Sequence, residues 1–308
     1  MAGIGQPVRR VEDFRLLTGQ GCYSDDWRME GQAHAVALRS PHAHARLVRI
    51  DATRAKQMPG VLAVLTGADL AGDNLAAVPS RAIGDDPREP RFGNANGAPF
   101  QPTPQPLLPT DKARFVGEAL AFVVAETAAQ ARDAAERVDI EYEALPPVVG
   151  VAAALRGGAT RLWENRADNV YIDAELGDRA ATDSAFARAA HVVKLTTLCQ
   201  RVTGAPMEPR AALGSYDPRE DRFTLWSGSG GVHRQRDALA GVLGVAPERV
   251  RIVNRDVGGS FGTRNNFTVE SGLVCWASKR VGRPVKWLSD RSECFLSDYQ
   301  GRDLTADA

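Results

Sequence analysis

Apolar and polar residues between positions 33 and 65 follow a pattern that predicts short strands and one short helix. Residues 51–58 are predicted to be helical, and Asp51 or Thr53 can cap this helix because a short side-chain oxygen accepts free backbone N–H groups. Strands are indicated where apolar residues recur at the two-residue period of a half-buried strand. They are predicted over residues 33–38, 46–50 and 61–65.

A second unit follows between residues 116 and 142. Residues 116–125 are mostly apolar and rich in β-formers, residues 127–137 are rich in alanine, and residues 138–142 alternate between apolar and polar side chains. A strand, a helix and a strand in so short a span predict a compact βαβ element.

Residues 72–110, which separate these units, show little periodicity. Eight prolines fall between Pro79 and Pro109. Proline removes a backbone donor and fixes φ, so regular structure is not expected there. A long irregular segment inside a compact domain is usually functional or mobile. We favour a surface loop, and the alternative is an arm that embraces another subunit or the rest of this chain.

The second half of the chain begins after a linker. Proline and glycine cluster between Pro146 and Gly158, so a domain boundary is predicted near residue 150, with one domain over 1–150 and another over 151–308. Both mix strands and helices, which makes the predicted fold class α+β. In the second domain, strands are predicted over 191–202, 210–216 and 222–227 as a meander and over 250–256 and 284–288, helices over 232–243 and 270–281, and a capped turn over 290–293.

Residues 304–308, at the end of the sequence, alternate as if a strand were beginning. An unpaired strand at the edge of a domain exposes free backbone groups, and complete proteins tend to cover such edges. We therefore expect residues 151–308 to be the first part of a larger domain.

Composition and charge narrow the class of protein. The chain is 44% hydrophobic and 25% charged, which is typical of a globular protein. Its formal net charge of zero disfavours nucleic acid and anionic membranes as partners, because both select a basic excess. No apolar run approaches the roughly 18 residues that span a bilayer, and no apolar signal segment follows Met1. We expect a cytoplasmic protein with no membrane span.

The cysteines and histidines do not predict a metal site. The cysteines stand far apart and none is in a C-x-x-C pair, so neither zinc nor an iron–sulfur cluster is expected, and the thiols are interpreted as reduced. His42 and His44 share one face of an extended segment near His34, but a metal would need further ligands. His191 is interpreted as structural, at the start of a strand. The cysteines are Cys22, Cys199, Cys275 and Cys294.

The densest chemical signal is the glycine segment, residues 256–264, which reads Asp256-Val257-Gly258-Gly259-Ser260-Phe261-Gly262-Thr263-Arg264. Its glycines allow backbone N–H groups to converge on an anion, Phe261 offers a flat apolar wall and Arg264 a fork for phosphate. The segment is neither G-x-G-x-x-G nor a P-loop with its lysine. The residues alone leave two interpretations: a site for a phosphate-bearing ligand, and a tight strand–helix turn.

The glycine segment resembles the Gly-Gly-Gly-Phe-Gly-x-Lys/Arg segment of the molybdenum hydroxylases, the family of xanthine dehydrogenase, aldehyde oxidoreductase and the carbon monoxide dehydrogenase large subunit. Each further similarity is weak alone, but the series runs in order along nearly the whole chain and is specific. It comprises Gly5-x-Pro7-Val8-x-Arg10-x-Glu12-Asp13, Leu17-Thr18-Gly19, Ser40-Pro41-His42-Ala43-His44-Ala45, Phe115-Val116-Gly117-Glu118, Met207-Glu208-Pro209-Arg210, Gly282-Arg283-Pro284-Val285-Lys286 and Asp290-Arg291-Ser292-Glu293.

This resemblance implies a hammerhead-like α+β domain followed by the first part of a molybdopterin-binding domain. It implies hydroxylation of an aldehyde or an N-heteroaromatic carbon, with oxygen taken from water at molybdenum on molybdopterin in its cytosine dinucleotide form. Electrons would leave through an iron–sulfur small subunit and an FAD medium subunit. The residues that it places at the cofactor are Gly258, Gly259, Ser260, Phe261 and Gly262, with Arg264, Gly230 and His233 beside them.

Two features depart from the family pattern. Gly230 stands where relatives often carry a glutamine that hydrogen-bonds an oxo group on molybdenum, and a glycine has no side-chain donor. This favours a divergent subfamily. The family's chain is also much longer, and its catalytic base lies in the later part. No catalytic residue is therefore predicted within this portion, and the base is expected downstream of residue 308, on a longer chain or on a second polypeptide.

Glu208 is the best carboxylate candidate for a general base in this portion. The alternative, which we favour, is a structural ion pair with Arg210 or with another arginine.

Two alternatives to an enzyme subunit stay open. The chain would be a truncated or split polypeptide whose hammerhead domain serves assembly only, or a phosphate-ligand module that binds nucleotide without molybdenum. The first predicts no turnover by the 308-residue chain.

Overall fold

Seven strands from both halves of the chain form one mixed sheet, in the order β10-β9-β8-β11-β1-β5-β3. The computed structural model describes residues 4–78, 94, 97, 103 and 105–308. β1 runs parallel to β11, and this pairing joins strands from the two halves. The strands are β1 (Ala33–Arg39), β3 (Val61–Thr66), β5 (Ala119–Ala125), β8 (Ala211–Asp217), β9 (Arg222–Ser227), β10 (Val250–Val253) and β11 (Val285–Leu288).

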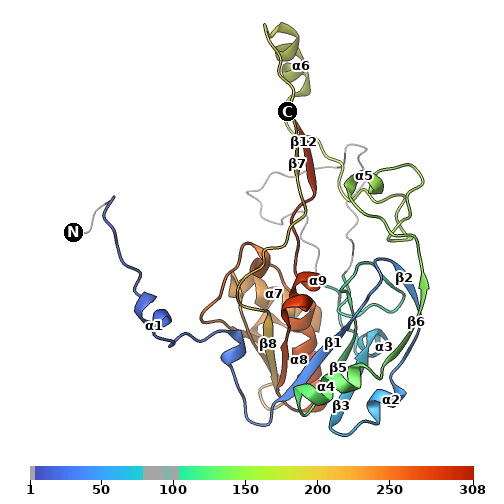
Figure 1. Cartoon of the computed structure of the whole chain (residues 1–308), viewed down its shortest axis with the longest axis vertical. Helices are drawn as coiled ribbons and strands as arrows, with labels where there is room; N and C mark the ends of the chain where they lie inside the picture. Colours follow the sequence, from blue (N-terminus) through green and yellow to red (C-terminus); the bar gives the residue numbers. More distant parts are fainter. Residues whose placement is uncertain (1–3, 79–93, 95–96, 98–102, 104) are drawn as a thin grey trace.

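Helices cover both faces of this sheet, which explains why β5 is buried at every position. Phe122 and Val124 of β5 lie in the main core with helices α7 (Val232–Leu243) and α8 (Val269–Val281). Val123, on the other face, packs with α4 (Ala128–Ala135). Figure 1 shows α4, α8 and the strands of the sheet together in the body of the molecule, with the carboxyl end of the chain rising above.

The predicted βαβ element is wrong in its pairing, although its strand, helix and strand all exist. β5 lies in the large sheet, whereas β6 (Asp139–Ala144) pairs with β2 (Ala45–Asp51) in a separate sheet of order β4-β2-β6, in which β4 is Lys112–Ala113. The burial patterns give the reason. β5 is apolar on both faces and needs a central position, whereas β6 is half-exposed and is suited to an edge.

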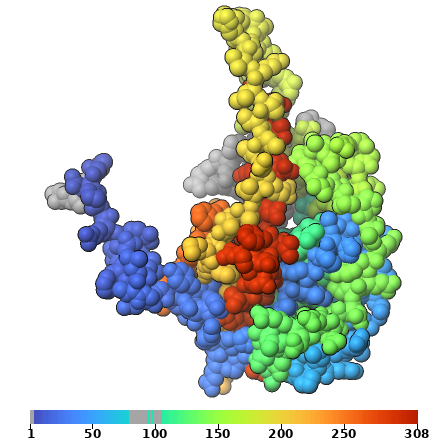
Figure 2. Space-filling view, viewed as in Figure 1, coloured from blue at the N-terminus to red at the C-terminus, as the bar shows by residue number. Residues whose placement is uncertain are grey.

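The predicted meander is also partly wrong. β8 and β9 form the expected hairpin, but β7 (Thr196–Cys199) leaves them and pairs with β12 (Leu304–Asp307), the strand expected at residues 304–308. His191 lies before β7, outside any strand. This two-stranded ribbon and α6 (Arg179–Arg188) stand away from the body, as does the N-terminal arm, residues 4–22, which carries α1 (Figures 1 and 2).

The other predicted elements agree with the structure to within a few residues. The carboxylate of Asp290 accepts from Glu293 N–H at 2.7 Å, which is the expected cap. Much of the proline-rich stretch lies outside the described residues, so its two interpretations remain predictions. Within the described part of the chain, no helix is long and apolar enough to cross a membrane. The remaining elements are α1 (Asp13–Leu17), α2 (Thr53–Lys56), α3 (Gly67–Gly72), α5 (Val151–Ala154), α9 (Arg291–Ser297), and the short 3₁₀ turns η1 (Ser24–Asp26), η2 (Pro247–Arg249) and η3 (Thr263–Asn265).

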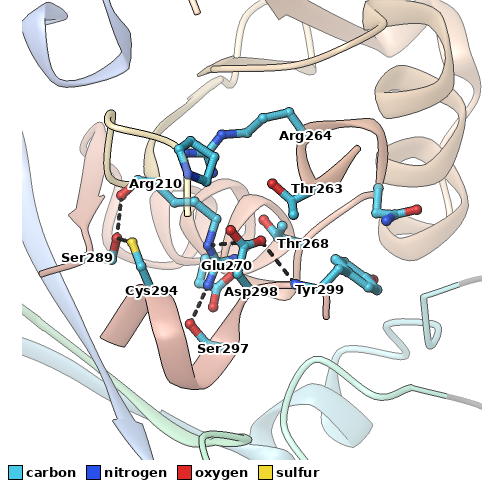
Figure 3. Close-up of polar contacts among 12 residues, drawn as sticks. Arg210, Thr263, Arg264, Thr268, Glu270, Ser289, Cys294, Ser297, Asp298 and Tyr299 are labelled. Carbon is cyan, nitrogen blue, oxygen red and sulfur yellow. Dashed lines mark hydrogen bonds and ion pairs between the residues drawn. The ribbon is translucent and has the colours of Figure 1, made fainter. Parts of the chain in front are cut away.

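A buried ion cluster joins β1, α8, α9 and the residues before β8. Glu270 is 1% exposed and receives Arg39 at 2.5 Å and Arg210 at 2.9 Å, one on each oxygen. Arg39 also contacts Glu293 at 2.7 Å. Figure 3 shows Arg210 reaching Glu270 and Ser297. Burial alone would raise the pKa of Glu270, but the two guanidinium groups outweigh it and lower that pKa to about 2.

The close approach of α8 to β8 depends on a glycine. A Cβ at Gly214 would lie 2.6 Å from the backbone of Val274 and Cys275, and backbone atoms cannot rotate away. We expect Gly214→Ala to lower the free energy of unfolding by about 1–3 kcal/mol, because helix and sheet must separate. The matched control is Gly241→Ala in α7, where a Cβ meets open space. It should raise stability by about 0.5–1 kcal/mol. Denaturant unfolding measures both, and equal effects would contradict this packing argument.

Candidate functional site

The backbone of the glycine segment is in the left-handed region at three positions. It lies between β10 and α8, with φ of +116° at Gly259 and +90° at Gly262. Phe261 has φ of +47°, a conformation that is strained for a bulky residue and that clusters at functional sites. Its side chain is 77% exposed. A Cβ at Gly262 would meet nothing within 4 Å, so one face of the segment is open.

Glu208 holds this segment in place. One oxygen of its carboxylate accepts from Gly258 N–H at 2.8 Å, and the other accepts from Ser24 N–H at 2.9 Å. A Cβ at Gly258 would lie 2.4 Å from Cβ of Glu208, so the two backbones can approach only because residue 258 is glycine. The predicted ion pair of Glu208 with an arginine is wrong. Arg210 turns to Glu270, and Glu208 binds backbone N–H groups.

Arg264 supports the glycine segment from the interior of the protein. It is 5% exposed and its guanidinium donates to the carbonyl of Glu208 at 2.6 Å. Its own carbonyl accepts from Gly230 N–H at 2.9 Å. The side chain is therefore directed into the protein, away from the open face on which a phosphate would lie.

Asp256, at the start of the glycine segment, ties down the N-terminal arm. Its carboxylate receives both Nη atoms of Arg15, at 2.6 and 2.7 Å, and Cys22 N–H at 2.7 Å. The hydrogen bonds from Arg15 and then Cys22 hold the pKa of this carboxyl well below its usual range. No sequence pattern predicts this pair, because 241 positions separate Arg15 from Asp256.

Gly230 and His233 lie beside the glycine segment. Gly230 is hydrogen-bonded to Arg264, and His233 is exposed on the first turn of α7. Met207, next to Glu208, is also exposed, and Arg291 donates to its carbonyl at 2.7 Å. The structure thus brings together the glycine segment, residues 207–210 and residues 228–233.

A cavity of about 1060 Å³ opens next to these residues. Asn265, which directly follows the glycine segment, and Arg234 of α7 line it, together with Glu118 and Trp163 from other parts of the chain. Arg114, also in the wall, lies over the ring of Trp163 and pairs with Asp111 at 2.7 Å. Neither Asn265 nor Glu118 was predicted to line a cavity. Asn265 adjoins the glycine motif, and Glu118 ends the segment Phe115-Val116-Gly117-Glu118 that resembles the family, but no pattern in the sequence indicates that its carboxyl is buried beside a cavity.

Glu118 is a buried carboxyl in this wall. It is 6% exposed, and burial raises its pKa to about 7 although it accepts Arg114 N–H at 2.6 Å. Loss of hydration of the charged form thus outweighs the hydrogen bond.

The remaining candidates have structural environments. Among the described residues, no cluster of His, Cys, Asp and Glu could hold a metal ion, and the four cysteines are free. Burial raises the pKa of the Cys275 thiol well above its usual range, which opposes reactivity. His44 is buried and its Nδ1 lies 3.0 Å from the carbonyl of Pro146, and His42 packs on Tyr142.

Comparison with known proteins accounts for both parts of the chain. A family model of the aldehyde oxidase and xanthine dehydrogenase a/b hammerhead domain matches residues 18–146. A model of the molybdopterin cofactor-binding domain matches residues 162–308.

Individual relatives are similar along nearly the whole chain. The nicotine 6-hydroxylase large subunit of Paenarthrobacter nicotinovorans is 38% identical over 96% of this chain, which corresponds to 34% of that protein. The carbon monoxide dehydrogenase large chain of Afipia carboxidovorans is 34% identical over 98% of this chain and 37% of its own length. The chain therefore spans about a third of the length of these relatives.

Solved structures show the same fold. Quinoline 2-oxidoreductase from Pseudomonas putida 86 superimposes with a TM-score of 0.83 at 38% identity, over 97% of this chain and 36% of that one. A Cu,Mo-containing CO dehydrogenase gives a TM-score of 0.85 at 32% identity, over 98% of this chain and 37% of that one.

The role of Glu208 can be tested by removing its charge. We expect Glu208→Gln to lower the free energy of unfolding by about 1–3 kcal/mol, because an amide has one oxygen and its NH₂ group would face an N–H donor. Denaturant unfolding measures this. Glu248→Gln, at an exposed position, should stay within about 0.5 kcal/mol of the wild type. A loss no larger at Glu208 than at Glu248 would refute the role of the carboxylate.

Glu118 should make stability depend on pH. Its pKa of about 7 lies above the 4.5 of a free glutamate, so its contribution to stability is fully present below pH 4.5 and is lost as pH rises to 7. Glu118→Gln cannot ionise, so its stability relative to the wild type should rise by about 3 kcal/mol across that window. Chemical unfolding at a series of pH values measures the difference. The exposed Glu30→Gln variant should run parallel to the wild type, and the same parallel curve for Glu118→Gln would rule out the shifted group.

Proposed function

Because this chain belongs to the family of xanthine dehydrogenase, aldehyde oxidoreductase and the carbon monoxide dehydrogenase large subunit, we propose that it forms the cofactor-binding front of a molybdenum hydroxylase. The reaction proposed is hydroxylation of an aldehyde or an N-heteroaromatic carbon with oxygen from water. The names of the relatives, which include hydroxylases and dehydrogenases of nicotine and carbon monoxide, support this class of redox chemistry and leave the substrate of this chain open.

The observation that carries the proposal is the open face of the glycine segment, on which backbone N–H groups have no described partner. Gly259 and Gly262 are in the left-handed region, and a side chain at Gly258 is excluded by Glu208. In the described contacts, the N–H groups of residues 259–262 donate to no backbone carbonyl, so they are available to a polar ligand. Residues of this kind fit the polar edge of molybdopterin, which would supply the redox-active metal when bound.

Each proposed site residue has a distinct part in binding. We propose that Gly258, Gly259, Ser260 and Gly262 contact the pterin through their backbone, and that the exposed Phe261 covers its apolar side. Gly230 and His233 would complete the rim of the site, as the resemblance implies. The role that we propose for Arg264 differs from the phosphate contact expected from the sequence. Its guanidinium donates to the carbonyl of Glu208 and so holds the glycine segment in position.

The finer parts of the proposal concern the whole enzyme. We propose the cytosine dinucleotide form of molybdopterin, and electron transfer to an iron–sulfur small subunit and an FAD medium subunit. Names such as large subunit and large chain among the relatives support an assembly of several subunits. We also propose a domain boundary near residue 150, which the two family-model matches, ending at 146 and beginning at 162, support.

A role in assembly only is the second candidate function. It is favoured by one observation: both oxygens of the best-placed carboxylate, Glu208, already accept hydrogen bonds from backbone N–H groups, which is the arrangement of a structural group rather than of a free base. We therefore propose that the isolated 308-residue chain does not turn over substrate. On this view the base comes from residues with no counterpart here, since the chain spans about a third of its relatives.

Elemental analysis of N-terminally tagged protein from its native cells tests the proposal. We expect about one molybdenum per tagged chain, and no hydroxylation by the 308-residue chain expressed alone. Absence of molybdenum would overturn the hydroxylase proposal. Nucleotide binding by molybdenum-free protein in calorimetry would favour the phosphate-ligand module instead, and turnover by the isolated chain would refute the expected inactivity.

A further inference from the structure

Gly230 lacks a side chain for a reason other than backbone conformation. Its φ lies outside the left-handed region, so any residue could adopt it. What excludes a side chain is Asn265: a Cβ at Gly230 would lie 1.9 Å from Oδ1 of Asn265 and 3.0 Å from its Cγ. The carboxamide of Asn265 therefore occupies the space that a side chain at 230 would fill.

The two backbones are fixed relative to one another, so only a movement of the Asn265 side chain can relieve this overlap. Gly230 N–H donates to the carbonyl of Arg264 at 2.9 Å, and Asn265 N–H donates to the carbonyl of Gly262 at 3.2 Å. Arg264 is buried and bonded to Glu208, which also holds Gly258. Only the side chain of Asn265 can rotate, and it would have to do so if residue 230 were larger.

The carboxamide of Asn265 lies in the wall of a cavity. Asn265 directly follows the glycine segment, is exposed, and lines the cavity of about 1060 Å³. In the described part of the chain, its side chain makes no hydrogen bond. A carboxamide carries two N–H donors and one acceptor, so it is suited to an oxygen atom of a bound cofactor or substrate.

We propose that Gly230 and Asn265 are a complementary pair in which Asn265 presents a carboxamide to an oxygen of the ligand held by the glycine segment. The small residue at 230 makes room for the group, which reaches the site from position 265. This inference rests on the proposed function, because the ligand in question is the molybdopterin cofactor. It assigns Asn265 as a further residue that contacts this cofactor.

The shared space can be tested without any cofactor. In the purified 308-residue chain, Gly230→Ala should lower Tm by about 2–4 °C, because the new methyl group displaces Asn265. The same change in an Asn265→Ala background should lower Tm much less, since the competing atoms are gone. Gly231→Ala is the matched control: it alters the neighbouring glycine, where a Cβ meets nothing within 4 Å. Its effect should be the same in both backgrounds, and additive effects at 230 would overturn the pair.

Cofactor retention tests the contact with the ligand. After gel filtration of tagged protein from native cells, bound pterin is measured by fluorescence of its oxidised form. Asn265→Ala should retain about fivefold less pterin, as expected for one lost hydrogen bond. The double variant Gly230→Gln, Asn265→Ala returns a carboxamide from position 230 and should recover most of it, whereas Asn266→Ala, one residue along, should not show this rescue by Gly230→Gln.

The outcomes separate the two proposals. The role of Asn265 is overturned if the wild type holds pterin and Asn265→Ala loses none of it. It is also overturned if Asn265→Ala loses pterin and Gly230→Gln does not restore it. Either result leaves the proposed function standing. No pterin in the wild type overturns the proposed function and with it the ligand contact, while the thermal experiment still decides whether residues 230 and 265 share one space.

Discussion

The structure depends on one buried carboxylate, Glu270, which lies between two arginines. Arg39 comes from the first half of the chain and Arg210 from the second, so charge neutralisation at Glu270 joins the halves. Removing one partner from such a cluster leaves an uncompensated buried charge, which typically costs about 3–5 kcal/mol. Both guanidinium groups also lie over the ring of Trp287, so aromatic packing and charge pairing fix the same point.

The position of the candidate site depends on this buried cluster around Glu270. Arg210 is held by Glu270, and two residues earlier Glu208 binds the N–H of Gly258. The glycine segment is thus positioned by a short chain of contacts that begins in the core. The groups that we propose to face the ligand are backbone N–H groups, the exposed ring of Phe261 and the carboxamide of Asn265. Such groups would bind and orient a ligand, which suits a protein whose chemistry is carried by a cofactor.

Much of the local structure could be predicted, because hydrophobic period and caps act over a few residues. The helix at 232–243 agrees with α7, and the Asp290 cap is present. Strand partners could not be predicted in the same way. β5 and β6 are neighbours in sequence but lie in different sheets, and β7 pairs with β12 rather than β8. A strand's period says which face is buried, whereas its partner depends on which other surfaces need cover.

The sequence by itself determined the elements, the fold class and the family, since the glycine segment and the other motifs keep their order whatever the packing. Only the tertiary structure decided the roles of single side chains. In the structure Arg264 points into the protein, and Glu208 accepts from two backbone N–H groups rather than from an arginine. The carboxamide of Asn265 occupies the space beside Gly230. The physical reason is that hydrogen bonds and steric exclusion act over a few ångströms in space, between residues that are 35 to 241 positions apart along the chain.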